Sequence, residues 1–276
     1  MKSMGCNLSI ATVFNMSNTI FYFTGTGNSL KVAKDVAAEI DGTNIISMAA
    51  NIGKVADFSP QGAVGFIFPV YYCGLPQLVQ EFISCIDLSS ASYIYIACTY
   101  GAMAGNAGCI SQAQKLIKSK GKVLDAAFYV KCIDNFILWT WDITPAKKHD
   151  VIHKGANQKS KDIARIVIKR GAHQDKSITE HIGPVVFGYN RFLKTVKAND
   201  KAFYWENTCN ACGLCEKVCP TNNIDLVARP IWKSENCQRC LACLHLCPRA
   251  CIQYGLVTTK RKRYKNPHIT IDELIL

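Results

Sequence analysis

The sequence predicts an α/β fold, an open, doubly wound parallel sheet of five strands, followed by a small cysteine-rich α+β unit. Across residues 18–171, β-rich segments alternate with segments whose apolar residues repeat at helical spacing. This alternation is typical of parallel sheets whose crossover helices cover both faces. Beyond residue 203 the chain carries eight of its 15 cysteines in two regular groups, and this part is too small to build a core unaided.

The first predicted strand, 19–23, passes through a glycine-rich turn into a helix over 28–40, where apolar residues recur every three or four positions. A short second strand covers 44–48. The third strand, 63–68, is continuously apolar, as expected of a strand that is buried on both faces of a parallel sheet.

The alternation continues with a helix over 75–86, whose apolar residues keep helical spacing throughout. A fourth strand follows at 92–98 and a helix over 109–117. The fifth strand is predicted at 123–131, and a last helix at 159–170 has Ile163, Ile166 and Val167 on its inner face.

Segments outside these units have weaker patterns. One short amphipathic piece around Phe192 predicts a linker that docks on one of the two units. Lys260–Arg263 and Lys265 predict a solvated basic tail, with folding back of the region around Tyr264 as the alternative. The expected segments are an N-terminal extension (1–17), the α/β domain (18–171), a linker (172–202), the cysteine-rich domain (203–255) and a basic C-terminal tail (256–276).

The cysteine-rich domain contains an internal repeat with an offset of 28 residues. The pattern Cys-x2-Cys-x2-Cys-x3-Cys-Pro occurs twice, and a duplicated unit predicts a pseudo-two-fold module. The first copy consists of Cys209, Cys212, Cys215 and Cys219, and the second of Cys237, Cys240, Cys243 and Cys247.

Three thiolates two residues apart can hold three corners of an iron–sulfur cubane, while the fourth cysteine of each copy reaches the other cluster. Zinc is the alternative, but zinc ribbons favour two separated Cys-x2-Cys pairs. Cys251 is expected to pack rather than to ligate. The region from Phe203 to Tyr254 resembles bacterial two-cluster ferredoxins. The predicted ligand sets for two [4Fe-4S] clusters are Cys209, Cys212, Cys215 and Cys247 for the first, and Cys219, Cys237, Cys240 and Cys243 for the second.

The turn after the first strand offers backbone amides at a helix N-terminus together with several hydroxyls, which suits a phosphate. A Walker loop is excluded because Lys31 follows Leu30 at the wrong spacing. The dinucleotide fingerprint is excluded because Leu30 stands where its third glycine is needed. A monophosphate held mainly by hydroxyls and amides remains.

Residues 18–171 resemble the flavodoxin family, whose cofactor is FMN and whose flavin loops follow the first, third and fourth strands. The resemblance implies that Thr24, Thr26, Asn28 and Ser29 hold the phosphate with the Gly27 amide, and that Tyr71 or Tyr72 and Tyr100 stack on the flavin ring. The full predicted FMN site is Thr24, Gly25, Thr26, Gly27, Asn28, Ser29, Pro69, Val70, Tyr71, Tyr72, Gly74, Thr99, Tyr100, Gly101, Gly105 and Asn106.

These three loops contain no Asp or Glu, unlike those of many flavodoxins. The order of the two domains resembles flavodoxin–ferredoxin fusion proteins of anaerobes. Within that resemblance, the stretch from Asp134 to Trp139 looks like a family segment near the flavin. A hydrophobic lid or a domain interface is the alternative for this stretch.

The resemblance implies an electron-transfer protein that passes electrons between two [4Fe-4S] clusters and FMN and on to a redox partner protein. An FMN-dependent reductase of a quinone or nitro compound, fed by the ferredoxin domain, is the alternative, and a redox sensor or scaffold is a third class. The sequence leaves the partner, the catalytic residues and the oligomeric state open.

Composition and charge indicate the compartment and the partners to expect. No run of apolar residues is long enough to span a membrane, and Leu8–Phe14 lacks the features of a secretory signal, so we expect a reducing cytoplasm. The net charge of +12 would fall to about +6 with two clusters and a flavin phosphate bound. Nucleic acid is not expected, because no recognition helix or aromatic-rich context accompanies the basic run.

Overall fold

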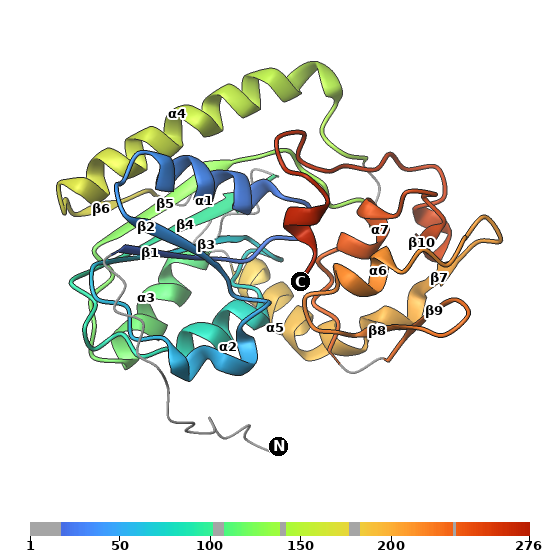
Figure 1. The fold of residues 1–276 in the computed structure, drawn as a ribbon, viewed down its shortest axis with the longest axis horizontal. Coiled ribbons are helices and arrows are strands. Elements are labelled where there is room, and N and C mark those ends of the chain that lie inside the picture. The colour runs from blue at the N-terminus through green and yellow to red at the C-terminus, as the bar shows by residue number, and fades with distance from the viewer. Residues whose placement is uncertain (1–17, 102–107, 139–141, 177–182, 234–235) are drawn as a thin grey trace.

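The computed structural model describes residues 18–101, 108–138, 142–176, 183–233 and 236–276. A parallel sheet with the strand order β2-β1-β3-β4-β5-β6 organises the first part of the chain (Figure 1). The five expected strands are present, and a two-residue edge strand extends the sheet beyond them. The strands are β1 (Asn18–Tyr22), β2 (Thr43–Ser47), β3 (Ala63–Pro69), β4 (Tyr93–Tyr100), β5 (Ala126–Lys131) and β6 (His173–Gln174).

Helices cover both faces of this sheet, as Figure 1 shows. Apolar side chains of α1 (Asn28–Ala38) and α4 (His149–Ile168) pack on one face, and those of α2 (Gln77–Cys85) and α3 (Cys109–Ser119) pack on the other. The sheet and its helices therefore form the expected flavodoxin-like three-layer arrangement. The carboxyl ends of the strands lie at the edge that faces the cysteine-rich domain.

Helix α4 begins ten residues earlier than the apolar pattern predicts. Its first half is mostly exposed and polar, whereas Ile163, Ala164 and Val167 are buried against the sheet. Sequence periodicity reports only the part of a helix that packs on a core. The described residues also form short 3₁₀ helices: Ile52–Asp57, Ala146–Lys148, Val196–Ala202, Gly255–Val257 and Asp272–Leu274.

The cysteine-rich domain consists of two short antiparallel ribbons and two short helices. The backbone repeats with the offset of the cysteines, because α6 and α7 begin 28 residues apart, as do β8 and β10. The ribbons pair β7 (Phe203–Trp205) with β10 (Ile252–Tyr254) and β8 (Ile224–Leu226) with β9 (Pro230–Trp232), and the helices are α6 (Leu214–Lys217) and α7 (Ala242–Leu246).

Left-handed backbone conformations follow the same repeat. Successive residues that alternate between right- and left-handed conformations turn their N–H groups inward and form a concave anion site of the kind found around iron–sulfur clusters. The two cysteine loops therefore share the same backbone conformation. The repeated positive-φ pairs are Ala211 and Arg239, Gly213 and Leu241, and Asn222 and Ala250.

The region expected to be a linker contains helix α5 (Gly183–Thr195). Its Tyr189 and Phe192 are buried and, with Val196, pack against the loop that follows β3. The docking expected for the amphipathic piece is therefore directed to the flavodoxin-like domain.

The expectation of a solvated C-terminal tail was wrong. The chain folds back from the cysteine-rich domain onto α1, and the side chains of Tyr264, Asn266, Ile269 and Leu274 are buried. The alternative, folding back of the region around Tyr264, is the one that the structure shows. Among the helices of the described residues, none is long and apolar enough to cross a membrane.

Candidate functional site

A cavity of about 300 Å³ opens at the carboxyl ends of β1, β3 and β4. Open parallel sheets bind ligands at this edge. The structure brings together at this cavity Thr24, Gly25, Thr26, Asn28, Ser29, Pro69, Val70, Tyr71, Tyr72, Thr99, Tyr100 and Gly101. Of the other predicted residues, Gly27 and Gly74 lie in the same loops without lining the cavity, while Gly105 and Asn106 lie outside the described residues.

The phosphate loop between β1 and α1 is held by its own hydroxyls. The Gly27 amide donates to Thr24 Oγ1 over 3.0 Å, and the hydroxyls of Ser29 and Thr99 lie 2.8 Å apart. Helix α1 begins without a side-chain cap, so amides of its first turn remain suited to an anion. These donors, with no side-chain charge among them, fit the terminal phosphate of FMN.

Three aromatic side chains that contact one another line the cavity. The rings of Tyr72 and Phe192 stack with centroids 4.3 Å apart, and Phe136 meets Tyr72 edge-on at 5.5 Å. Tyr72 and Cys73 have φ angles of 48° and 69°. A bulky residue in this region is strained, and such strain concentrates at ligand-binding loops.

Burial also changes the acidity of the tyrosines here. It raises the pKa of Tyr71 well above its usual value, with the nearby Cys240 and Cys237 adding to the effect. Burial likewise raises the pKa of Tyr100. Both side chains therefore stay neutral near pH 7 and offer flat, uncharged rings to a flavin.

Sequence reasoning missed several residues that line the cavity. Asp134, Asn135 and Phe136 come from the segment after β5, while Arg239 and Cys240 come from the cysteine-rich domain. An acidic group therefore does face the cavity, although the three flavin loops have none. Burial raises the pKa of the Asp134 carboxyl, which accepts a hydrogen bond from the Phe136 amide. The resemblance of the segment from Asp134 to a flavin-side segment was the only signal for it.

The stretch that begins at Asp134 also forms part of a domain interface, as the alternative interpretation predicted. Ile137 and Leu138 are buried in the apolar cluster of the cysteine-rich domain. The same short segment thus contributes polar groups to the cavity and apolar groups to the neighbouring domain. Trp139 lies outside the described residues.

The eight repeat cysteines surround two further small cavities. Three cysteines of one copy and the fourth cysteine of the other line each cavity, the grouping expected for crossed ligation, and Cys251 also lines the cavity of the first copy. No three His, Cys, Asp or Glu side chains of the described residues are close enough to hold a single metal ion. The quartets are Cys209, Cys212, Cys215 and Cys247, and Cys219, Cys237, Cys240 and Cys243.

The chemistry of these quartets fits a cationic cluster core. Burial raises the pKa of the Cys215 thiol to about 11 and that of the Cys237 thiol to about 12, so bound iron is what would keep such thiols deprotonated. Backbone amides already point at sulfur: Asn223 N donates to Cys219 Sγ over 3.2 Å and Arg239 N to Cys237 Sγ over 3.3 Å. Cys251, expected to pack, lies with its sulfur 3.4 Å from Cys247 Sγ.

Two protein families match the chain in separate regions. The family described as a flavodoxin domain matches residues 19–130, and the family described as a 4Fe-4S binding domain matches residues 202–225. The chain joins a flavodoxin domain to a 4Fe-4S domain. This pair of domains is that of an electron-transfer iron–sulfur flavoprotein, in which the first domain indicates FMN and the second indicates a 4Fe-4S cluster.

Solved structures match about half of the chain at low identity. The Trp repressor binding protein from Bacillus subtilis is 15% identical, with 56% of this chain and 97% of that chain covered and a TM-score of 0.36. An azoreductase from Bacillus anthracis str. Sterne is 10% identical, with coverages of 54% and 99% and a TM-score of 0.35. The Flv1 flavodiiron core from Synechocystis sp. PCC6803 is 17% identical, with coverages of 56% and 37% and a TM-score of 0.34. A comparison with curated proteins finds no match.

Cys240 connects the two domains directly. It lines both the large cavity of the flavodoxin domain and the small cavity of its own cysteine quartet. The approach is close, because a Cβ on Gly25 would lie 2.5 Å from the carbonyl oxygen of Cys240. Only glycine at position 25 leaves room for the cysteine loop.

Arg239, next to Cys240 in the sequence, also joins the cysteine-rich domain to the flavodoxin domain. Its Nη1 donates to the Tyr72 hydroxyl over 2.9 Å, and its guanidinium lies 5.7 Å from the centre of the Tyr72 ring. One residue earlier, Gln238 Oε1 accepts a hydrogen bond from the Leu78 amide over 3.0 Å. The cysteine loop is thus fixed against the flavin loop by hydrogen bonds as well as by packing.

Proposed function

We propose that this protein binds one FMN and two [4Fe-4S] clusters and passes electrons between them and a redox partner protein. FMN occupies the cavity above the phosphate loop, with its phosphate at the N-terminus of α1. The two cysteine quartets ligate the clusters, each taking its fourth cysteine from the other copy of the repeat. FMN supplies the ability to accept one or two electrons, while each cluster exchanges one.

The observation that carries this proposal is the position of Cys240. A cluster bound by its quartet would lie next to the FMN cavity, with a single cysteine shared between the two walls. The other quartet includes Cys212, which is exposed. The second quartet thus adjoins the flavin cavity and the first quartet contains an exposed cysteine, which supports an internal electron path that opens to a partner at Cys212.

Rapid mixing tests the path. Anaerobic protein is mixed with a one-electron donor protein or with limiting dithionite, and cluster and flavin absorbance are followed together. We expect cluster bleaching first and flavin reduction second, at a rate independent of protein concentration because the transfer is within one molecule. A flavin rate that rises in proportion to protein concentration would contradict the internal path.

The identity of the flavin and the position of its phosphate can be tested separately. Deproteinised protein should release FMN and not FAD, since the loop offers donors for one terminal phosphate. Thr26→Asp should lower flavin occupancy because it places a negative charge beside the phosphate in a partly buried site. Thr26→Asn is the matched neutral control, and equal occupancy in both variants would place the phosphate elsewhere.

The reductase alternative has its own outcome. Protein with externally reduced clusters is supplied with a quinone or a nitro compound, and substrate loss is measured over many turnovers. An electron carrier is expected to reduce these compounds slowly and without saturation. Saturable turnover would favour the reductase and would place a substrate in the cavity beside Phe136 and Tyr72.

A further inference from the structure

The C-terminal strap, residues 256–276, runs from the 4Fe-4S domain to the phosphate loop of the flavodoxin domain. Its central side chains are nearly inaccessible to solvent, with 5% of Tyr264 and 2% of Asn266 exposed. Ile269 and Leu274 pack with Leu30 of α1 and with apolar residues of α6 and α7. The strap therefore belongs to the core between the two domains.

The strap forms hydrogen bonds with two residues at the start of α1, Thr26 of the phosphate loop and Asn28. The Asn266 amide donates to the Thr26 carbonyl over 2.8 Å. Asn28 Oδ1 accepts from the Tyr264 hydroxyl over 2.7 Å and from Asn266 Nδ2 over 3.0 Å. Asn28 Nδ2 in turn donates to the Ile133 carbonyl over 3.1 Å. The two acceptor sites of the Asn28 carbonyl oxygen are filled by the strap, so this side chain serves as an anchor.

Gly27, which lies between Thr26 and Asn28, packs closely against the strap. Its φ angle is 97°, and a Cβ at this position would lie 3.1 Å from the Cβ atoms of both Asn266 and Ile269. The strap presses on the turn that starts α1. Residue 27 must therefore be glycine for two independent reasons, its backbone conformation and the closeness of the strap.

A second route leads from the 4Fe-4S domain to the same loop. The Tyr264 amide donates to His245 Nδ1 over 3.2 Å, so the proton of this ring is on Nε2, which donates to the Asn135 carbonyl over 2.8 Å. Asn135 Nδ2 then donates to Thr26 Oγ1 over 2.6 Å. One histidine of α7 thus holds both the strap and the segment that touches Thr26.

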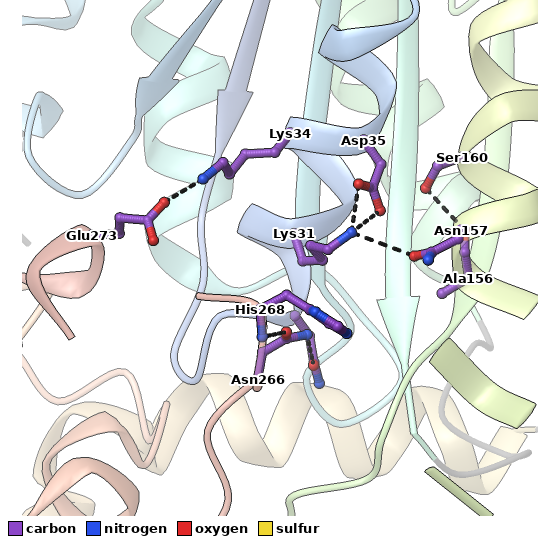
Figure 2. Close-up of polar contacts among 10 residues, drawn as sticks. Lys31, Lys34, Asp35, Ala156, Asn157, Ser160, Asn266, His268 and Glu273 are labelled. Atoms are coloured by element: carbon purple, nitrogen blue, oxygen red, sulfur yellow. Dashed lines mark hydrogen bonds and ion pairs between the residues drawn. The ribbon is translucent and has the colours of Figure 1, made fainter. Parts of the chain in front are cut away.

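The outer end of the strap is held more loosely. Glu273 pairs with Lys34 of α1 at 2.5 Å, as Figure 2 shows, and both side chains are substantially exposed. The Leu276 amide donates to the Lys217 carbonyl over 3.1 Å. Exposed ion pairs contribute little to stability, so the Lys34–Glu273 pair offers a control that leaves the buried contacts in place.

We infer that the C-terminal strap is part of the flavin phosphate site, where Tyr264 and Asn266 act as positioning residues that hold Asn28 and the turn before α1 in the phosphate-binding geometry. This inference rests on the proposed FMN site. It makes FMN affinity depend on a segment of the chain more than 230 residues from the phosphate loop. The dependence acts through the phosphate and leaves the ring contacts unchanged.

Flavin binding to the cluster-loaded, flavin-stripped chain tests the inference. Dissociation constants for FMN and for riboflavin, which lacks the phosphate, are measured by quenching of flavin fluorescence. Tyr264→Phe and Asn266→Ala should each weaken FMN binding about tenfold, the effect of one lost hydrogen bond of usual strength. Both should change riboflavin binding less than about twofold. Lys34→Gln should change neither constant.

A double-mutant cycle identifies Asn28 as the intermediary. In the Asn28→Ala background, Tyr264→Phe should weaken FMN binding by less than about twofold, because its partner is already gone. Additive losses would overturn the role of Asn28. Equal losses for FMN and riboflavin, or wild-type FMN affinity in both strap variants, would overturn the inference. A wild-type chain that binds FMN no tighter than riboflavin would instead refute the phosphate site of the proposed function.

Discussion

At the scale of single residues, Cys219 and Cys247 decide whether the two cysteine copies act separately or together. Each lines the cavity of the other copy. Cys219→Ser should therefore reduce the iron content from about eight to about four per chain and remove the cluster next to the flavin. Cys247→Ser should remove the outer cluster. Iron and sulfide analysis with paramagnetic resonance of the reduced protein distinguishes the two losses.

Cys251→Ser is the control for these variants. Its sulfur lies 3.4 Å from Cys247 Sγ, yet it belongs to neither quartet, so the iron content should stay at about eight per chain. Loss of the outer cluster in Cys251→Ser, with an intact cluster in Cys247→Ser, would show that Cys251 is the ligand. Loss of the outer cluster in Cys219→Ser would refute crossed ligation.

Asp134 is the acidic side chain of the FMN cavity that the flavin loops do not supply. Reduction adds negative charge to a flavin, and a neighbouring carboxylate opposes it. Asp134→Asn should raise the two-electron midpoint potential of the flavin by about 30 mV, equivalent to about 1.4 kcal/mol. Asparagine can still accept the hydrogen bond from the Phe136 amide, so the loop is retained.

An anaerobic potentiometric titration of the flavin measures this shift. Asp150→Asn removes the same charge from the exposed first turn of α4 and should leave the potential unchanged. An unchanged potential in Asp134→Asn would contradict the expected effect of this carboxylate on the flavin.

At the scale of elements, α5 depends on the tight loop after β3. A Cβ on Gly74 would lie 2.2 Å from the Tyr189 ring, whose hydroxyl donates to the Leu75 carbonyl over 2.7 Å. Gly74→Ala should therefore destabilise the fold by about 1–3 kcal/mol through overpacking. Anaerobic thermal unfolding should show a lower melting temperature together with easier proteolysis near α5.

A glycine of helix α4 with open space around it serves as the control for Gly74→Ala. Gly155 lies inside this helix, and a Cβ there would meet nothing within 4 Å. Gly155→Ala should stabilise the fold by about 0.5–1 kcal/mol, because alanine loses less backbone entropy in a helix. If both substitutions raised the melting temperature, the close packing of Tyr189 on Gly74 would be refuted.

One repeated position of the cysteine loops is occupied by glycine in the first copy and by a bulky residue in the second. Gly213 and Leu241 hold equivalent left-handed positions in the two copies. Glycine takes this conformation freely, whereas leucine is strained in it. Leu241 also lines the candidate flavin cavity.

At the scale of the whole molecule, the arrangement predicts its cofactor content. Anaerobically purified protein should contain about eight iron atoms, eight acid-labile sulfides and one FMN per chain. Iron, sulfide and flavin assays on one sample give the three ratios. About four iron atoms would mean that only one of the two quartets holds a cluster, and zinc without sulfide would refute both clusters.

Much of the fold could be predicted because its patterns are local. Each strand and helix of the flavodoxin domain carries its own apolar spacing, and the cysteine repeat is regular over a few residues. The phosphate loop was predicted from its hydroxyls and the helix N-terminus that follows it. The two ring loops were predicted from the resemblance to flavodoxins, together with the rule that the carboxyl ends of parallel strands meet at one edge. The main misjudged segments, the start of α4 and the tail, are those whose structure depends on distant partners.

What the sequence determined by itself was the pair of domains, the loops of the candidate flavin site and the two groups of cysteines. Only the tertiary structure placed Arg239 at the candidate flavin cavity, made Cys240 common to two cavities and closed the strap on Asn28. Those contacts join residues as many as 238 positions apart, and a polar residue buried by a distant segment leaves no periodic pattern in its own neighbourhood. Their positions follow from the packing of one domain on the other.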